Sequence, residues 1–138
     1  MLEHCLACRC TFACAKIEAY LQDAEAAGEQ FDVVILDPPK LAPTRKHLEN
    51  AKRKYASLNA AAMQVLRPGG LLMTCSCSGA VAQAPAGTFA GIVRQAAAKE
   101  GRTITVLREA GAAPDHTLVP EFPHGRYLTN LLVQVNVG

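Results

Sequence analysis

Hydrophobic and polar positions alternate along the chain in segments that predict both helices and strands. Apolar residues recur at helical spacing over 17–24, and Gly28 is a suitable end for that helix. Residues 31–36 (FDVVIL) form a nearly continuous, β-branched apolar run, which is typical of a strand buried on both faces of a parallel sheet. The prolines at 38–39 cannot continue a strand ladder, so Asp37 is predicted at the strand's carboxyl end.

The rest of the chain continues this alternation. The same reasoning predicts a helix over 44–66 ended by RPGG, a strand over 71–74, a helix over 88–99, and strands over 103–107 and 128–137. Because the last strand follows a loop, we expect it to run antiparallel at the end of the sheet. Strand–helix alternation predicts a mostly parallel, doubly wound α/β sheet, in which ligands bind outside the carboxyl ends of the strands.

Composition and charge narrow the class of protein. The 138 residues suffice for one domain, 1–138. The sequence contains no run of about 18 apolar residues, so no membrane span is predicted. A net charge of +2 is too small to indicate nucleic-acid binding by itself. Five basic residues are nevertheless concentrated within ten positions: Arg45, Lys46, Lys52, Arg53 and Lys54. This cluster fits contacts with phosphates and fits a solvated helix face equally well.

The six cysteines form two groups, one of four near the N-terminus and the pair Cys75 and Cys77. The first group, Cys5, Cys8, Cys10 and Cys14, lies within ten residues, whereas the usual zinc layout separates two close pairs by a longer loop. Free or buried thiols are therefore favoured over a metal site. They fit a reducing compartment, the cytoplasm or an organelle matrix, and no targeting peptide is visible.

Two polar segments follow predicted strands, at 37–40 (DPPK) and 74–79 (TCSCSG). A rigid Pro-Pro turn with the Asp37 carboxylate could hold the polar edge of a flat base, and Cys77 could attack that base. A thiolate that adds at C6 of cytosine makes C5 nucleophilic, and an acid near N3 stabilises the developing charge. Alternatively, the Asp-Pro-Pro segment is only a turn and Cys77 only a small buried side chain.

Residues 31–40 resemble motif IV of class I S-adenosylmethionine-dependent methyltransferases, which have a Rossmann-like fold. Over roughly residues 31–135 the chain resembles a narrower family, the RlmI-type large-subunit rRNA cytosine-C5 methyltransferases. The matching positions are Tyr55, Asn59, 66–70 (LRPGG), 76–79 (SCSG), 114–116 (PDH), 122–123 (FP), Gly125, Tyr127 and Leu128.

The resemblance implies that S-adenosylmethionine is the cofactor, that an rRNA is the substrate and that Cys77 is the nucleophile. Asp37, with Pro38 and Pro39, would line the pocket for the methyl donor and the base, and Asp37 would also take part in catalysis. The substrate contacts implied are Lys40, Ser76, Ser78, His116 and Tyr127. Cys75 has no counterpart in the family and is interpreted as a packing residue.

The chain departs from the related pattern at two points. Better-known RNA cytosine methyltransferases carry a second cysteine where this chain has Lys40, so the base that removes the C5 proton is unidentified. His116 is a candidate, although a histidine bonded to its own turn explains that position as well. Residues 1–14 contain no glycine, so the glycine-rich turn and first strands of the fold are missing. We therefore expect the C-terminal half of a catalytic domain.

The missing strands have a physical consequence. The strand over 33–36 would expose a flat apolar edge, which favours a homodimer or a partner chain. Two alternatives to an active cytosine methyltransferase stay open. One is an inactive truncated fragment with an RNA-contacting or structural role. The other is an amino-group methyltransferase that uses DPPK and does not need Cys77.

Overall fold

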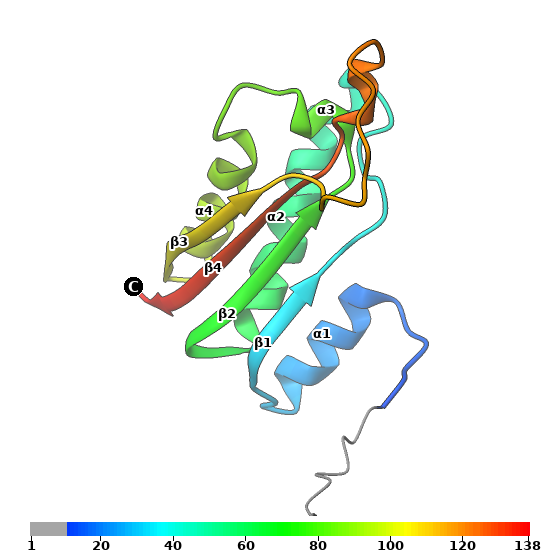
Figure 1. Ribbon diagram of the computed structural model, residues 1–138. Coiled ribbons are helices and arrows are strands. Elements are labelled where there is room, and N and C mark those ends of the chain that lie inside the picture. The colour runs from blue at the N-terminus through cyan, green and yellow to red at the C-terminus, as the bar shows by residue number, and fades with distance from the viewer. Residues whose placement is uncertain (1–10) are drawn as a thin grey trace, which may run out of the picture.

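The computed structural model describes residues 11–138 (Figure 1). Its elements are α1 (Ile17–Ala26), β1 (Phe31–Leu36), η1 (Arg45–His47), α2 (Leu48–Gln64), β2 (Leu66–Ser76), α3 (Gly79–Ala82), α4 (Thr88–Lys99), β3 (Arg102–Ala110), η2 (Pro123–Gly125) and β4 (Thr129–Val137). The predicted alternation is confirmed, and the helix over 88–99 has the predicted ends. The short helices α3 and η2 were not predicted, and η1 occupies the start of the helix predicted over 44–66.

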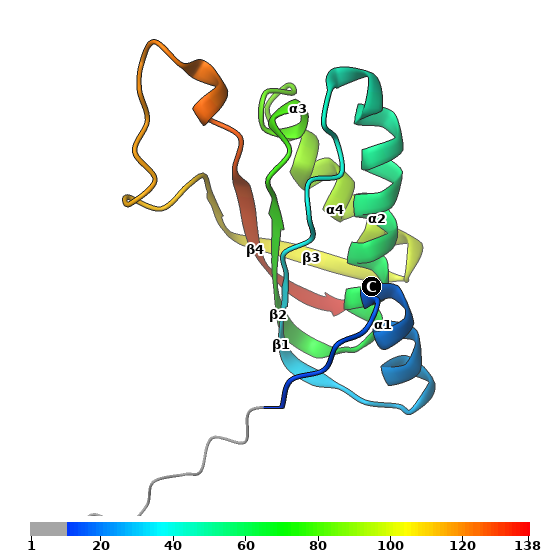
Figure 2. The same ribbon diagram turned by 90° about the vertical axis from the view of Figure 1, so that its right-hand side faces the viewer.

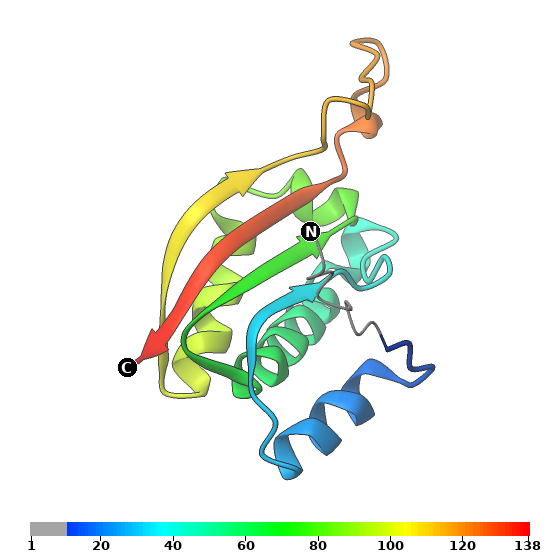
Figure 3. The ribbon, with the colours of Figure 1, turned by 60° about the horizontal axis from the view of Figure 1, so that its bottom comes forward.

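The four strands form one sheet in the order β1-β2-β4-β3 (Figure 3). β1 and β2 are parallel, and β4 is antiparallel to both of its neighbours. The predicted direction of β4 is confirmed, but its predicted place at the end of the sheet is wrong. Leu131, Val133 and Val135 of β4 are fully buried, and such a strand gains most from neighbours on both sides. Only one of the three pairings is therefore parallel.

The helices of the described chain cover one face of the sheet (Figure 2). α2 and α4 pack against each other and on the sheet, and α1 lies against α2 near β1. Residues at helical spacing on α2, including Ala51, Tyr55, Leu58 and Ala62, are buried there. The expectation of a doubly wound sheet, with helices on both faces, is not met within residues 11–138. No helix in this range is long and apolar enough to cross a membrane.

Two strand predictions need correction. Leu66, placed at the end of the predicted helix, begins β2 instead, and the RPGG segment lies within that strand. The RPGG segment interrupts the parallel pairing of β1 with β2: Phe31 pairs with Leu66, but Val33 pairs with Leu71, so the register shifts between Phe31 and Val33. β1 is not buried on both faces: Val33 and Ile35 are 54% and 66% exposed, because the described helices cover only the opposite face of the sheet (Figure 2).

Candidate active site

The polar segments predicted to meet do so at the carboxyl ends of β1 and β2. Leu36 pairs with Thr74 in the parallel register, so the residues after Leu36 lie beside the last residues of β2. The Cys77 thiol lies 3.9 Å from the carbonyl oxygen of Pro38, within the range of a weak S–H hydrogen bond. The segments 37–47, 77–88 and 111–128 all gather at this end of the sheet (Figure 1).

Asp37, Cys75 and Cys77 form one cluster at this edge. Burial raises the pKa of the Cys75 thiol, and the negative charges of Asp37 and Cys77 raise it further. Asp37 is exposed, whereas both cysteines are half-buried. Sequence reasoning assigned Cys75 to packing. Its i,i+2 spacing from Cys77 on a strand was the signal that both side chains share one face.

The two serines that flank Cys77 form hydrogen bonds with Tyr55 on α2. Ser76 Oγ donates to the Tyr55 hydroxyl at 2.9 Å, and Ser78 Oγ lies 3.1 Å from the same hydroxyl. Ser78 Oγ also accepts from the backbone N–H of Ala42 at 3.1 Å. Ser76, Ser78 and Tyr55 are all fully buried. Both serine hydroxyls thus face the protein interior, where they position the strand end that carries Cys77.

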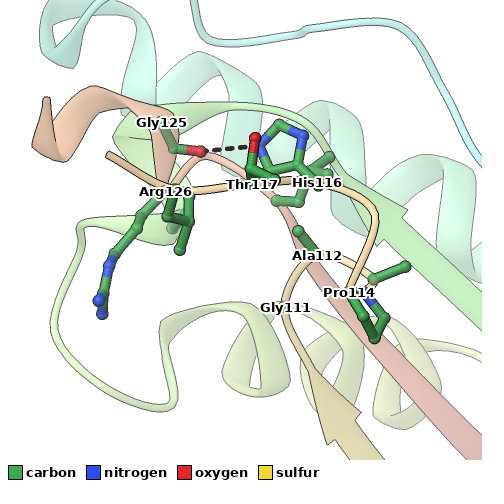
Figure 4. Close-up of a pocket in the computed structure, with 11 residues that line it drawn as sticks. Gly111, Ala112, Pro114, His116, Thr117, Gly125 and Arg126 are labelled. Atoms are coloured by element: carbon green, nitrogen blue, oxygen red, sulfur yellow. Dashed lines mark hydrogen bonds between the residues drawn. The ribbon is translucent and has the colours of Figure 1, made fainter. Parts of the chain in front are cut away.

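His116 lies in the loop that joins β3 to β4. Its Nε2 lies 3.1 Å from the carbonyl oxygen of Gly125, to which it donates (Figure 4). Its ring meets the Tyr127 ring edge-on at 5.3 Å between centroids. These contacts hold the two arms of the loop together around an open hollow of about 540 Å³. The geometry matches the alternative of a histidine bonded to its own loop.

Lys40 and Tyr127 line a second hollow, of about 280 Å³, together with Arg45 and His124. The remaining basic residues of the predicted cluster lie on η1 and α2. Lys52 forms an ion pair with Glu49 at 2.7 Å, so it is partly neutralised. The structure thus brings one cluster member, Arg45, next to two of the predicted substrate residues.

The residues predicted to line a methyl-donor pocket lie at the carboxyl end of β1, where Pro38 is buried and Asp37 and Pro39 are exposed. Within residues 11–138 no strand precedes β1 and no glycine-rich turn leads into it. Cys5, Cys8 and Cys10 lie outside the described part of the chain. The described residues contain no group of His, Cys, Asp or Glu side chains suited to a metal ion.

Comparisons with known proteins show that this chain is similar to one segment of larger proteins. No family model matches it. It is 37% identical over 127 residues to "Ribosomal RNA large subunit methyltransferase I" of Pseudoalteromonas atlantica, covering 92% of this chain and 31% of that protein. The proteins of the same name from Shewanella amazonensis and Photobacterium profundum are 40% and 42% identical over 91% and 85% of this chain. The chain spans about 30% of the length of these relatives.

Solved structures agree on the fold. The crystal structure of "SMU.776, a putative methyltransferase complexed with SAH" superposes with a TM-score of 0.67 at 17% identity, over 87% of this chain and 30% of that one. The structure of "A putative sam-dependent methyltransferase from Streptococcus mutans" gives a TM-score of 0.66 at 16% identity, over 87% of this chain and 29% of that one. The described chain therefore has the Rossmann-like methyltransferase fold.

Proposed function

Since this chain is a homologue of one segment of ribosomal RNA large subunit methyltransferase I, we propose that it carries part of the catalytic centre of an S-adenosylmethionine-dependent rRNA methyltransferase. One observation supports this most directly. The Cys77 thiol and the Asp37–Pro39 turn come from different strands and meet at the sheet edge where ligands bind in such folds.

The reaction proposed is methylation of cytosine at C5. The Cys77 sulfur forms a bond to C6 of the base, which places electron density on C5. When bound, S-adenosylmethionine would supply the methyl group to C5, and S-adenosylhomocysteine would be its leaving group. A base then removes the C5 proton, and the Cys77–C6 bond breaks to restore the aromatic ring. The acid form of the Asp37 carboxyl would donate a hydrogen bond to N3, where negative charge accumulates.

Each remaining residue has a role that its surroundings support. Pro38 and Pro39 keep the Asp37 turn rigid beside the donor and the base. Lys40, which is exposed, and Tyr127, which is half-buried, line the same hollow. In the proposed function both contact the RNA. We now assign Ser76, Ser78 and His116 to positioning rather than to direct substrate contact, because their polar atoms bond to Tyr55 or to the loop backbone.

The partners proposed are an rRNA and further polypeptide. Val33 and Ile35 are exposed on an edge strand, next to Leu71 and Met73 on the face that the described helices leave open. We propose that polypeptide from a partner chain, a second copy or another segment covers this surface in the working enzyme. The three described cysteines are free, which fits work in the cytoplasm.

The deciding experiment is methyl transfer from labelled S-adenosylmethionine to rRNA, with calorimetry of donor binding beside it. We expect Cys77→Ala to abolish transfer while Cys75→Ala, which removes the neighbouring half-buried thiol at the end of β2, keeps most of it. Transfer that survives Cys77→Ala would indicate an amino-group methyltransferase instead.

The second candidate is an inactive RNA-contacting piece. One observation favours it: within residues 11–138 no strand and no glycine-rich turn precede β1 to hold a methyl donor. In that case the chain would bind RNA, but neither donor binding nor transfer would be detected.

A further inference from the structure

A basic hollow lies next to the contact between Cys77 and Pro38. Lys40 follows Pro38 by two residues, and Gly79 follows Cys77 by two, and both line the hollow. Its lining comes from three segments that are distant in sequence: Lys40, Pro43, Thr44 and Arg45; Gly79, Ala80 and Gln83; His124 and Tyr127. The fold thus builds a concave surface of about 280 Å³ beside the proposed nucleophile.

The charges of this hollow are unbalanced. Lys40 and Arg45 are both exposed, and none of the nine lining residues is acidic. The ion pairs found within residues 11–138 lie elsewhere and join Lys52 to Glu49, Arg67 to Asp32, and Lys99 to Glu100. The hollow therefore holds two cations without an anionic partner in the described chain.

The donors fit an anion with oxygen acceptors, such as a phosphate, rather than an uncharged base. Arginine presents a planar fork to phosphate oxygens, and lysine adds a compact point charge. Gln83 and His124 add polar groups around them. Tyr127 closes one wall, and its ring is braced edge-on by His116.

We propose that this hollow binds the phosphodiester of a nucleotide adjacent to the target cytosine, with Lys40 and Arg45 as its two cationic contacts. The inference rests on the proposed function, because the hollow can hold a neighbouring phosphodiester only if the target base enters beside Cys77. It also explains why a lysine follows the Pro-Pro turn: Lys40 holds the backbone of the substrate while the chemistry occurs at Cys77.

The test uses the full chain and a fluorescein-labelled, single-stranded RNA oligonucleotide, with fluorescence anisotropy measured over a range of salt concentrations. The double variant Lys40→Gln/Arg45→Gln should lower the affinity and reduce the magnitude of the slope of log K against log salt by about 0.7, since both cations contact one phosphodiester and each phosphate contact on a single strand contributes roughly 0.7 to the slope. The matched control is Lys16→Gln/Arg94→Gln, which removes the same charges from exposed positions outside the hollow. It should keep the wild-type slope.

The outcomes separate the two proposals. Equal slopes for the two double variants would overturn the hollow as a phosphate site, while methyl transfer by the wild-type chain would still uphold the proposed function. A reduced slope confined to Lys40→Gln/Arg45→Gln would support the hollow even if no transfer is detected. Absence of salt-dependent RNA binding by the wild-type chain would overturn the hollow as well. Thermal melts followed by circular dichroism confirm that each variant is folded.

Discussion

The Tyr55 hydroxyl on α2 lies 2.9 Å from Ser76 Oγ at the last residue of β2. The same hydroxyl lies 3.1 Å from Ser78 Oγ, so one buried side chain fixes both neighbours of Cys77. The helix layer therefore determines where the proposed nucleophile stands, although it has no direct contact with a substrate.

Replacing Tyr55 by phenylalanine removes this shared partner. Two buried serine oxygens each lose a hydrogen bond, which should lower the free energy of unfolding by about 1–3 kcal/mol in urea titrations. Methyl transfer should fall as well, because Cys77 loses its fixed position. Tyr20→Phe, at an exposed tyrosine on α1, is the control and should change neither quantity. Equal effects of the two variants would contradict the positioning role of Tyr55.

The ionisation of Cys75 should depend on Asp37. Burial and two nearby negative charges raise the pKa of the Cys75 thiol above its ordinary value of 9.0, so less thiolate is present at any given pH. Asp37→Asn removes one of those charges and should shift the pH midpoint for alkylation of Cys75 by iodoacetamide downward. Peptide mass spectrometry identifies the site. An unchanged midpoint, or an equal shift in the exposed Asp23→Asn variant, would argue against this coupling.

Gly70 is required by close backbone approach in β2. A Cβ added there would stand 2.9 Å from the Arg67 carbonyl oxygen and 3.1 Å from that of Asp32. Gly70→Ala should therefore destabilise the fold by about 1–3 kcal/mol through overpacking. Gly91→Ala, on α4 where a Cβ meets nothing within 4 Å, should instead stabilise by about 0.5–1 kcal/mol. Chemical denaturation of both variants checks the opposite signs.

The open edge of β1 should govern self-association. Ile35→Lys places a charge on the apolar edge strand and should shift the chain toward monomer in light scattering at high concentration. Val137→Lys is a control of matched exposure, 65% against 66%, at the far end of β4. A wild-type chain that is already monomeric at high concentration would contradict association through this edge.

Periodicity alone located most elements, because their cores follow simple patterns. The helical spacing on α2 and the apolar run of β1 survive in the structure, since burial of one face dictates both. The ends were less predictable: RPGG looks like a helix stop, yet the parallel register with β1 draws it into β2. The order of the strands was not predictable. The position of β4 between β2 and β3 depends on burial against segments that are distant in the sequence.

The candidate site divides in the same way. The sequence by itself predicted that Asp37 and Cys77 follow neighbouring strands, because a polar residue after one strand and a thiol after the next can be read from local pattern. Only the tertiary structure turned Ser76 and Ser78 inward to Tyr55, and only it gathered Lys40 and Arg45 with the distant loop at 124–127. The physical reason is that local pattern determines which backbone segment reaches the edge of the sheet. Which groups then face each other depends on packing between segments that are far apart in the chain.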